Sequence, residues 1–141
     1  MDREQLQMHQ LKHLQDTVDS AMKTSFYKKR LGKVGITSGR DIKSLDDFKK
    51  LPFTSKDDLR ECYPNALLAV SKDEAVRIHT SSGTTGVPTV IYHTQEDLDH
   101  WTELVCRGIV SSGCTRNDVF QNMMTYGMFT GGLGLHYGAE R

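Results

Sequence analysis

The sequence predicts a mixed α/β fold, in which a helical N-terminal segment precedes a β-loop-β-α-β unit. We assign residues 1–70 to the helical segment and residues 71–141 to the unit that follows. In residues 3–25 apolar side chains recur at steps of three and four, which is typical of a helix with one buried face. Residues 75–80 alternate with period two, and residues 88–93 are β-branched and aromatic, so both runs predict strands. The helical stripe consists of Leu11, Leu14, Val18 and Met22.

The helical segment contains three further helix signals. Residues 26–35 predict a short second helix. Ser44 is an N-cap candidate followed three residues later by Asp47, a spacing that resembles a capping box. Thr54 stands in the same relation to Asp57. We therefore expect two more short helices, beginning after Ser44 and after Thr54.

The second part of the chain continues with a helix and a third strand. Thr94 is the N-cap candidate for a helix that runs to about Ser112, with Gly113 as its end. Residues 119–124 (VFQNMM) are apolar enough for a buried strand. From residue 125 on, glycines are interleaved with aromatic side chains. The helix face expected to be buried consists of Leu98, Trp101, Val105 and Ile109.

Composition and charge narrow the class of protein. Eighteen basic residues balance eighteen acidic ones, so a field that would attract nucleic acid or anionic lipid is missing. The first residues lack the apolar core of a signal peptide, and no apolar stretch is long enough to span a membrane. The three scattered cysteines favour reduced thiols, and the histidines lack metal-ligand spacing. We expect a cytoplasmic protein without a nucleic-acid partner, a membrane partner or a metal site.

The loop between the first two predicted strands is the sharpest chemical feature. Five hydroxyl side chains and two glycines fill seven consecutive positions. Glycine lets backbone N–H groups approach an anion closely, and hydroxyl groups add donors, so the loop suits phosphate oxygens. It is not a Walker loop, because its glycines are three apart and lack the following lysine. On composition alone, such a turn is more often a plain hairpin loop. The seven residues are Thr80, Ser81, Ser82, Gly83, Thr84, Thr85 and Gly86.

Residues 80–88 (TSSGTTGVP) resemble the phosphate-loop signature of adenylate-forming enzymes, which include acyl-CoA synthetases, luciferases and peptide-synthetase adenylation domains. The neighbouring segments narrow the resemblance to the phenylacetate-CoA ligase branch. These segments are 51–56 (LPFTSK), 58–60 (DLR), 63–64 (YP), 77–79 (RIH) and 126–140 (YGMFTGGLGLHYGAE).

The resemblance implies a fold and an activity. Residues 71–141 would be the first part of a large AMP-binding adenylation domain, truncated partway, with the small C-terminal domain absent. The implied enzyme is an acid-thiol ligase that joins a carboxylate to ATP, releases pyrophosphate, and then transfers the acyl group from AMP to coenzyme A. ATP, Mg²⁺, coenzyme A and an aryl acid are the implied cofactors and substrates. We expect this chain to be inactive alone, because the implied catalytic lysine would lie past Arg141, and we assign it no catalytic residue.

The resemblance also implies two binding sites. The first would hold the β- and γ-phosphates of ATP and consists of Ser81, Ser82, Gly83, Thr84, Thr85 and Gly86. Most adenylate-forming enzymes continue this loop with a lysine, whereas Thr89 stands there in this chain. The second would surround the aryl acid and consists of Tyr126, Gly127, Phe129, Thr130, Gly131 and Gly132, whose glycines would leave space for a flat ring. In the alternative, Tyr126 and Phe129 are ordinary core.

Two further expectations stay open at this stage. His79 lies beside the loop, where it could contact a ligand, but its place in an alternating strand favours a structural role. A stand-alone, non-enzymatic module that binds an anion or a partner protein is the alternative function. A truncated sheet would expose strand edges and apolar surface around 119–124, so we expect self-association, as a homodimer.

Overall fold

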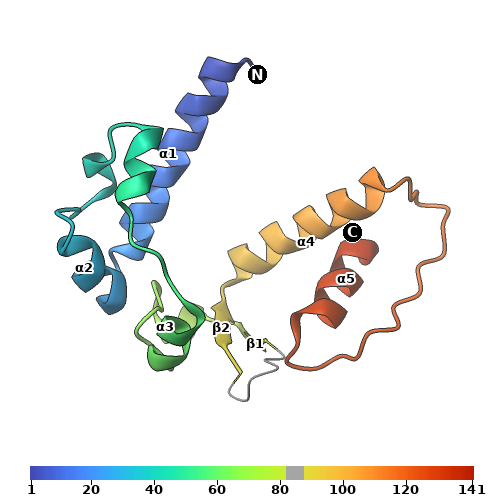
Figure 1. Cartoon of the computed structure of the whole chain (residues 1–141). Coiled ribbons are helices and arrows are strands. Elements are labelled where there is room, and N and C mark those ends of the chain that lie inside the picture. The colour runs from blue at the N-terminus through green and yellow to red at the C-terminus, as the bar shows by residue number, and fades with distance from the viewer. Residues whose placement is uncertain (82–87) are drawn as a thin grey trace. The chain divides into compact units, whose positions relative to one another are not determined.

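The computed structural model describes residues 1–81 and 88–141 (Figure 1). The chain divides into two compact units, Met1–Ser71 and Lys72–Arg141. The first unit is helical, and the second combines a two-stranded sheet with helices. The predicted fold class, a mixed α and β protein, is confirmed. Within the described residues, no helix combines the length and the apolar character needed to cross a membrane.

The first unit is built on α1 (Arg3–Ala21), whose apolar stripe covers a small core. Asp2 caps this helix, and α2 (Ser25–Gly32) follows after a short turn in which Thr24 accepts the N–H of Tyr27. Two 3₁₀ helices, η1 (Gly39–Asp41) and η2 (Leu45–Lys50), and α3 (Lys56–Glu61) complete the unit. The buried core consists of Val18, Leu31, Ile36 and Ile42, with Leu11, Leu14 and Met22 packed against it.

The predicted helix starts in this unit are partly confirmed. Ser44 and Asp47 form a capping box at the start of η2, as predicted. The cap assigned to Thr54 is wrong by one position, because Ser55 caps α3 and Asp58 is its partner. Both spacings place a hydroxyl three residues before a carboxylate, so the sequence pattern did not distinguish them. Asp58 is also held by Arg30 at 2.8 Å, a contact that only the folded chain provides.

Asp47 makes η2 sensitive to acid. Lys50 donates a hydrogen bond of 2.6 Å to the Asp47 carboxylate, and the N–H groups of Lys43 and Ser44 donate two more. These bonds lower the pKa of Asp47 from 3.8 to about 2. The unfolded chain therefore binds the proton more readily, and the stability that Asp47 contributes is present above about pH 4 and is lost as the pH falls towards 2.

We therefore expect the urea midpoint of the protein to fall between about pH 4 and pH 2, and to fall less in an Asp47→Asn variant. The matched control is Asp46→Asn, a neighbouring carboxylate that pairs with Lys49 and lies outside the cap. An Asp47→Asn variant that loses as much stability over this pH range as the unchanged protein would contradict the assignment.

The second unit begins with η3 (Lys72–Glu74) and an antiparallel pair of strands. Strand β1 (Arg77–Thr80) pairs with β2 (Val90–His93), in a register that sets Arg77 opposite His93 and Thr80 opposite Val90. Helix α4 (Gln95–Ser111) follows at once, because Thr94 and Asp97 form a capping box at its start. Gly113, with φ +99°, ends it in a left-handed conformation that glycine adopts easily. The predicted strands, cap and helix end are confirmed here.

Two expectations for the end of the chain differ from the structure. Residues 119–124, all of them described, form no strand, and Val119 is 97% exposed. A strand needs a neighbour for its backbone groups, and no described segment pairs with this apolar run. The glycine-rich tail, for which no helix was predicted, forms α5 (Thr130–Glu140).

Helix α5 lies alongside α4 (Figure 1). Glycine in a helix costs about 0.5–1 kcal/mol relative to alanine, so the tail is a poor helix by local propensity. The packing explains why it forms. A Cβ added at Gly134 would lie 2.8 Å from Cε2 of Trp101, and one added at Gly138 would lie 2.7 Å from Cβ of Val105. These two glycines therefore allow the helices to approach at a distance that larger residues would prevent.

Candidate functional site

The predicted phosphate loop begins where β1 ends. Of its six predicted residues, Ser81 is described, whereas Ser82, Gly83, Thr84, Thr85 and Gly86 lie outside the described residues. The N–H of Ser81 donates to the carbonyl of Thr89 at 3.0 Å, and the N–H of Thr89 donates to Oγ of Ser81 at 3.3 Å. These two bonds join the two ends of the loop. The loop therefore starts from a paired, ordered base.

The C-terminal tail meets β1 at this same end. The N–H of Thr80 donates to the carbonyl of Met128 at 2.7 Å, and Thr80 and Phe129 form a parallel bridge. Nδ1 of His79 lies 3.2 Å from the same carbonyl oxygen. The structure thus brings the start of the predicted phosphate loop next to the predicted aryl-acid segment, 126–132. These two segments lie more than forty residues apart in the sequence.

His79 has a defined structural role. It is 1% exposed, and its Nδ1 must carry the proton that is shared with Met128, because a carbonyl can only accept. Its ring lies edge-on to the rings of His93 and Trp101, with both pairs of centroids 5.2 Å apart. His79 therefore attaches the segment around Met128 to β1 through this hydrogen bond. A direct contact with a ligand stays a prediction.

The surroundings of His79 are buried and polar. His93 stacks on Trp101 with ring centroids 5.6 Å apart. Burial lowers the pKa of His93 below its ordinary value, and the neighbouring His79 lowers it further, so His93 is neutral at neutral pH. Within the described residues, Nε2 of both histidines and Oγ1 of Thr89 are buried without a hydrogen-bond partner. Of these atoms, Oγ1 of Thr89 belongs to the base of the phosphate loop, whereas His93 pairs with Arg77 at the end of the sheet away from the loop.

The predicted aryl-acid residues divide into two groups. Tyr126 and Phe129 are partly exposed aromatic side chains, at 55% and 39%, and a Cβ added at Gly127 would meet open space. Thr130, Gly131 and Gly132 form the first turn of α5 instead. The sequence interpretation assumed that Gly131 and Gly132 leave open space for a ring, and in the structure they do not.

Each glycine of that first turn faces another part of the chain. A Cβ added at Gly132 would lie 2.5 Å from the carbonyl oxygen of Thr125, and one added at Gly131 would lie 3.0 Å from Sδ of Met124. The contact of Gly132 is with the backbone of Thr125, which cannot move aside as a flexible side chain can. Gly132 is therefore required for the close turn that leads into α5.

A polar network connects Tyr126 with α5. The hydroxyl of Tyr126 lies 3.0 Å from Nδ1 of His136 and 3.2 Å from Nδ2 of Asn122. The sequence interpretation missed both partners. His136 was included in the block 126–140 and was rejected as a metal ligand, but it was assigned no partner, and Asn122 lies in the run that was assigned to a strand. Asn122 and Tyr126 are four positions apart and Tyr126 and His136 are ten apart, but no helix was predicted for these segments, so the spacings were not interpreted as contacts.

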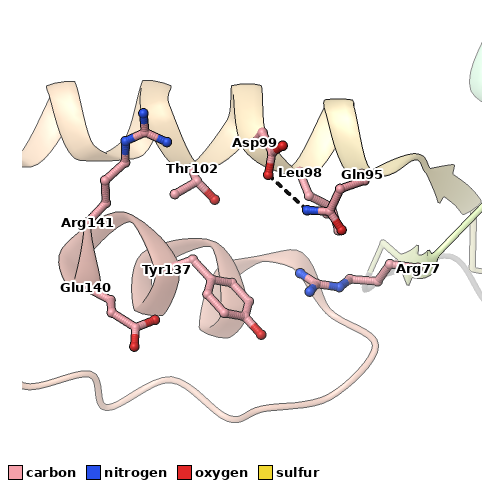
Figure 2. Close-up of a pocket in the computed structure, with 8 residues that line it drawn as sticks. All are labelled: Arg77, Gln95, Leu98, Asp99, Thr102, Tyr137, Glu140 and Arg141. Atoms are coloured by element: carbon pink, nitrogen blue, oxygen red, sulfur yellow. Dashed lines mark hydrogen bonds between the residues drawn. The ribbon is translucent and has the colours of Figure 1, made fainter.

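A hollow with a volume of about 460 Å³ lies between α4 and α5 (Figure 2). The Arg77 guanidinium lies over the ring of Tyr137, 5.0 Å from its centroid. Gln95 donates to Asp99 at 2.9 Å on the α4 side, as the dashed line in the figure shows. Basic and acidic groups both line the hollow, so its charge favours neither an anion nor a cation. Its lining residues are Arg77, Gln95, Leu98, Asp99, Thr102, Tyr137, Glu140 and Arg141.

No family model matches the chain, but named proteins do. The phenylacetate-coenzyme A ligase of Pseudomonas putida is 44% identical over 137 residues, which are 96% of this chain and 31% of that protein. The phenylacetate-coenzyme A ligase of Escherichia coli K12 is 42% identical over 139 residues, or 98% of this chain and 32% of that protein. The chain thus spans about a third of the length of the curated relatives that it matches.

Solved structures agree on the fold. A crystal structure of 2-hydroxyisobutyryl-CoA ligase, in complex with 2-HIB-AMP and CoA, matches with a TM-score of 0.87 and 26% identity. The match covers 99% of this chain and 31% of that one. The postadenylation state of the same ligase matches with the same TM-score at 24% identity. Almost the whole chain is therefore homologous to about a third of a phenylacetate-coenzyme A ligase, which confirms the resemblance read from its motifs.

Proposed function

We propose that this chain is part of an ATP-dependent ligase that converts an aryl acid, most simply phenylacetate, into its coenzyme A thioester. One observation carries the proposal: 42–44% identity to phenylacetate-coenzyme A ligases over 96–99% of the chain. A similarity that runs along nearly the whole chain does not favour the alternative of a stand-alone binding module. The activity belongs to a protein about three times as long as this chain, judged by those relatives.

The reaction has two steps. In the first, a carboxylate oxygen attacks the α-phosphorus of ATP, the bond to the β-phosphate oxygen breaks, and pyrophosphate leaves. In the second, the thiol sulfur of coenzyme A attacks the acyl carbon of the adenylate and AMP leaves. Both steps shift negative charge onto phosphoryl oxygens, so positioning and electrostatic stabilisation are the main contributions that a protein can make.

Within this proposal, residues 81–86 hold the β- and γ-phosphates through backbone N–H and hydroxyl groups. The paired base formed by Ser81 and Thr89 supports such a role, because it fixes both ends of the loop. Thr89 replaces the lysine of related loops, so this loop supplies no positive charge. The hydrogen-bond donors of the loop therefore have to provide the local stabilisation.

The cofactors follow from the same proposal. The structural neighbours are complexes with an acyl-AMP and with CoA, which supports ATP and coenzyme A as the nucleotide substrates. Among the described residues, no group of three His, Cys, Asp or Glu side chains could hold a metal ion. We propose Mg²⁺ as the companion of the ATP phosphates in the longer protein.

The partners and the location are also proposals. The residues proposed to surround the aryl acid are Tyr126, Gly127, Phe129, Thr130, Gly131 and Gly132, with the open space at Gly127 and the close turn at Gly131 and Gly132. The bridge between Thr80 and Phe129 supports this proposal, because it joins this segment to the residue at the start of the phosphate loop. Balanced charge supports a cytoplasmic protein without nucleic-acid or membrane partners. Exposed apolar side chains such as Val119 and Met123 support self-association, as a homodimer.

The test is carboxylate-dependent exchange of pyrophosphate into ATP, measured on the longest reading frame that contains this chain and on residues 1–141 alone. We expect exchange with phenylacetate in the longer protein, and none in residues 1–141. In a Gly83→Val variant of the longer protein, the rate of exchange should fall about 100-fold or more, because a side chain there would displace N–H donors from the phosphates.

The matched control is Gly108→Ala, a glycine of α4 with open space around it, which should leave the exchange unchanged. Indole-3-acetate, benzoate and a short fatty acid complete the panel of acids. Absence of exchange with every acid would reject the proposed function, and exchange that survives Gly83→Val would reject the role of the loop.

A further inference from the structure

The hydroxyl of Tyr126 has two hydrogen-bond partners within the second unit. Nδ2 of Asn122 lies 3.2 Å from it, and Nδ1 of His136 lies 3.0 Å from it. The Tyr126 and His136 rings meet edge to face, with centroids 5.6 Å apart. About half of the Tyr126 side chain is nevertheless exposed, so part of its ring is free to contact another molecule.

The hydrogen-bond directions in this network follow from Asn122. Its Oδ1 accepts the N–H of Met124 at 3.1 Å, so Nδ2 is the donor end of the amide. Nδ2 donates one hydrogen to the carbonyl of Gly132 at 2.8 Å and the other to the Tyr126 hydroxyl. The hydroxyl therefore accepts from Asn122, and its own hydrogen is available for His136.

The remaining atoms complete a consistent arrangement. If the Tyr126 hydroxyl donates to Nδ1 of His136, the neutral imidazole carries its proton on Nε2. Nε2 faces the carboxylate of Glu140, with Oε2 at 3.8 Å, which favours a proton at that position. Every member of the chain Asn122–Tyr126–His136–Glu140 then has a complementary neighbour. The network also joins residues before α5 to two turns of the helix.

We propose that Asn122 and His136 are positioning residues, which hold the Tyr126 ring in one orientation against the aryl group of the substrate. The inference rests on the proposed function, in which Tyr126 lies beside the aryl acid. Because the hydroxyl already has two hydrogen-bond partners, Tyr126 offers its exposed ring to the substrate. A ring that is held in place loses less conformational freedom on binding than a free one, so the network should lower the KM for the acid.

A purely structural role is the competing explanation, since the same bonds also attach residues 122–126 to α5. The two explanations differ in what they change. Positioning of Tyr126 affects the aryl acid and leaves ATP untouched, whereas loosening of the tail affects both substrates and the thermal stability. The KM values for the acid and for ATP therefore separate them.

The experiment compares two substitutions of one residue in the longest reading frame that contains this chain. His136→Asn keeps an acceptor at the position of Nδ1, and His136→Leu removes it. We expect His136→Leu to raise the KM for phenylacetate about tenfold, the effect of one lost hydrogen bond, with an unchanged KM for ATP and an unchanged Tm. The KM for phenylacetate of His136→Asn should stay close to that of the unchanged protein, because asparagine keeps the acceptor. His100→Leu, at an exposed histidine of α4, is the matched control and should change neither KM.

A double-mutant cycle completes the test. Tyr126→Phe removes the hydroxyl and keeps the ring, so His136→Leu should add little in that background if both act through the same bond. Equal increases in the two KM values, a lowered Tm, or full additivity would overturn the inference. Unchanged kinetics of His136→Leu would overturn it while the proposed function stands. Absence of exchange in the unchanged protein would reject the proposed function and this inference together.

Discussion

Replacing Gly134 by valine is expected to lower the free energy of unfolding by about 1–3 kcal/mol, through overpacking of the contact between α4 and α5. A Cβ at this position would lie 2.8 Å from Cε2 and 3.1 Å from Nε1 of Trp101. The indole cannot readily move aside, because His79 and His93 pack against it with centroids 5.2 and 5.6 Å away. The helices would therefore have to separate.

The separation should also have a functional consequence. Helix α5 carries His136 and begins with the turn around Gly132, so its displacement would disturb the segment proposed to surround the aryl acid. We expect a Gly134→Val variant of the longer protein to lose exchange activity together with stability. Urea denaturation and pyrophosphate exchange on the same sample would measure both.

Gly108→Ala is the control for this prediction. Gly108 is a helical glycine of α4 with open space around its Cα, so alanine there should raise the stability by about 0.5–1 kcal/mol. The two substitutions both enlarge a glycine in the same pair of helices, and they should change the stability in opposite directions. A Gly134→Val variant as stable as the unchanged protein would show that α4 and α5 do not pack as described.

Replacing Ile42 by alanine is expected to lower the free energy of unfolding of the first unit by about 2–5 kcal/mol. Ile42 is 0% exposed and lies in the core with Val18, Leu31 and Ile36. Its carbonyl also accepts a hydrogen bond of 2.8 Å from the side chain of Gln15, which fixes the backbone there. The surrounding chain is therefore held in place and cannot collapse fully into the cavity left by the lost methyl groups.

Amide hydrogen exchange resolved by segment would measure this effect. Protection should fall within residues 1–71, and the matched control Val34→Ala, at a side chain that is 47% exposed, should change little. Unaltered protection of α1 and α2 in Ile42→Ala would show that Ile42 does not support the core of this unit.

Local sequence patterns predicted the elements that satisfy their own backbone groups. The apolar stripe of α1 and the N-cap at Thr94 both appear where they were expected, because each depends on residues a few positions apart. The cap of α3 was misplaced by one residue, since Thr54 and Ser55 offer the same chemistry to carboxylates three positions later. Residues 119–124 failed as a strand because a strand depends on a partner that a local pattern does not contain.

In the candidate site, too, local residues predicted some features, and others depend on the folded chain. The hydroxyl- and glycine-rich loop and the block at 126–140 were recognised from the residues themselves, since their composition is unusual wherever they lie. Their proximity was not recognised, because it depends on hydrogen bonds from His79 and Thr80 to Met128, almost fifty residues away. The sequence likewise did not indicate His136 as a partner of Tyr126, because their contact depends on the formation of α5.

By itself, therefore, the sequence determined the mixed α/β class, most helix and strand positions, the phosphate-loop motif and the resemblance to phenylacetate-coenzyme A ligases, because these depend on residue identity and short spacings. Only the tertiary structure decided that the glycine-rich tail is a helix and that it lies against α4. The reason is that glycine opposes a helix locally, and that close packing of Gly134 on Trp101 and Gly138 on Val105 stabilises it. The same packing brings His136 to Tyr126 and so completes the proposed site.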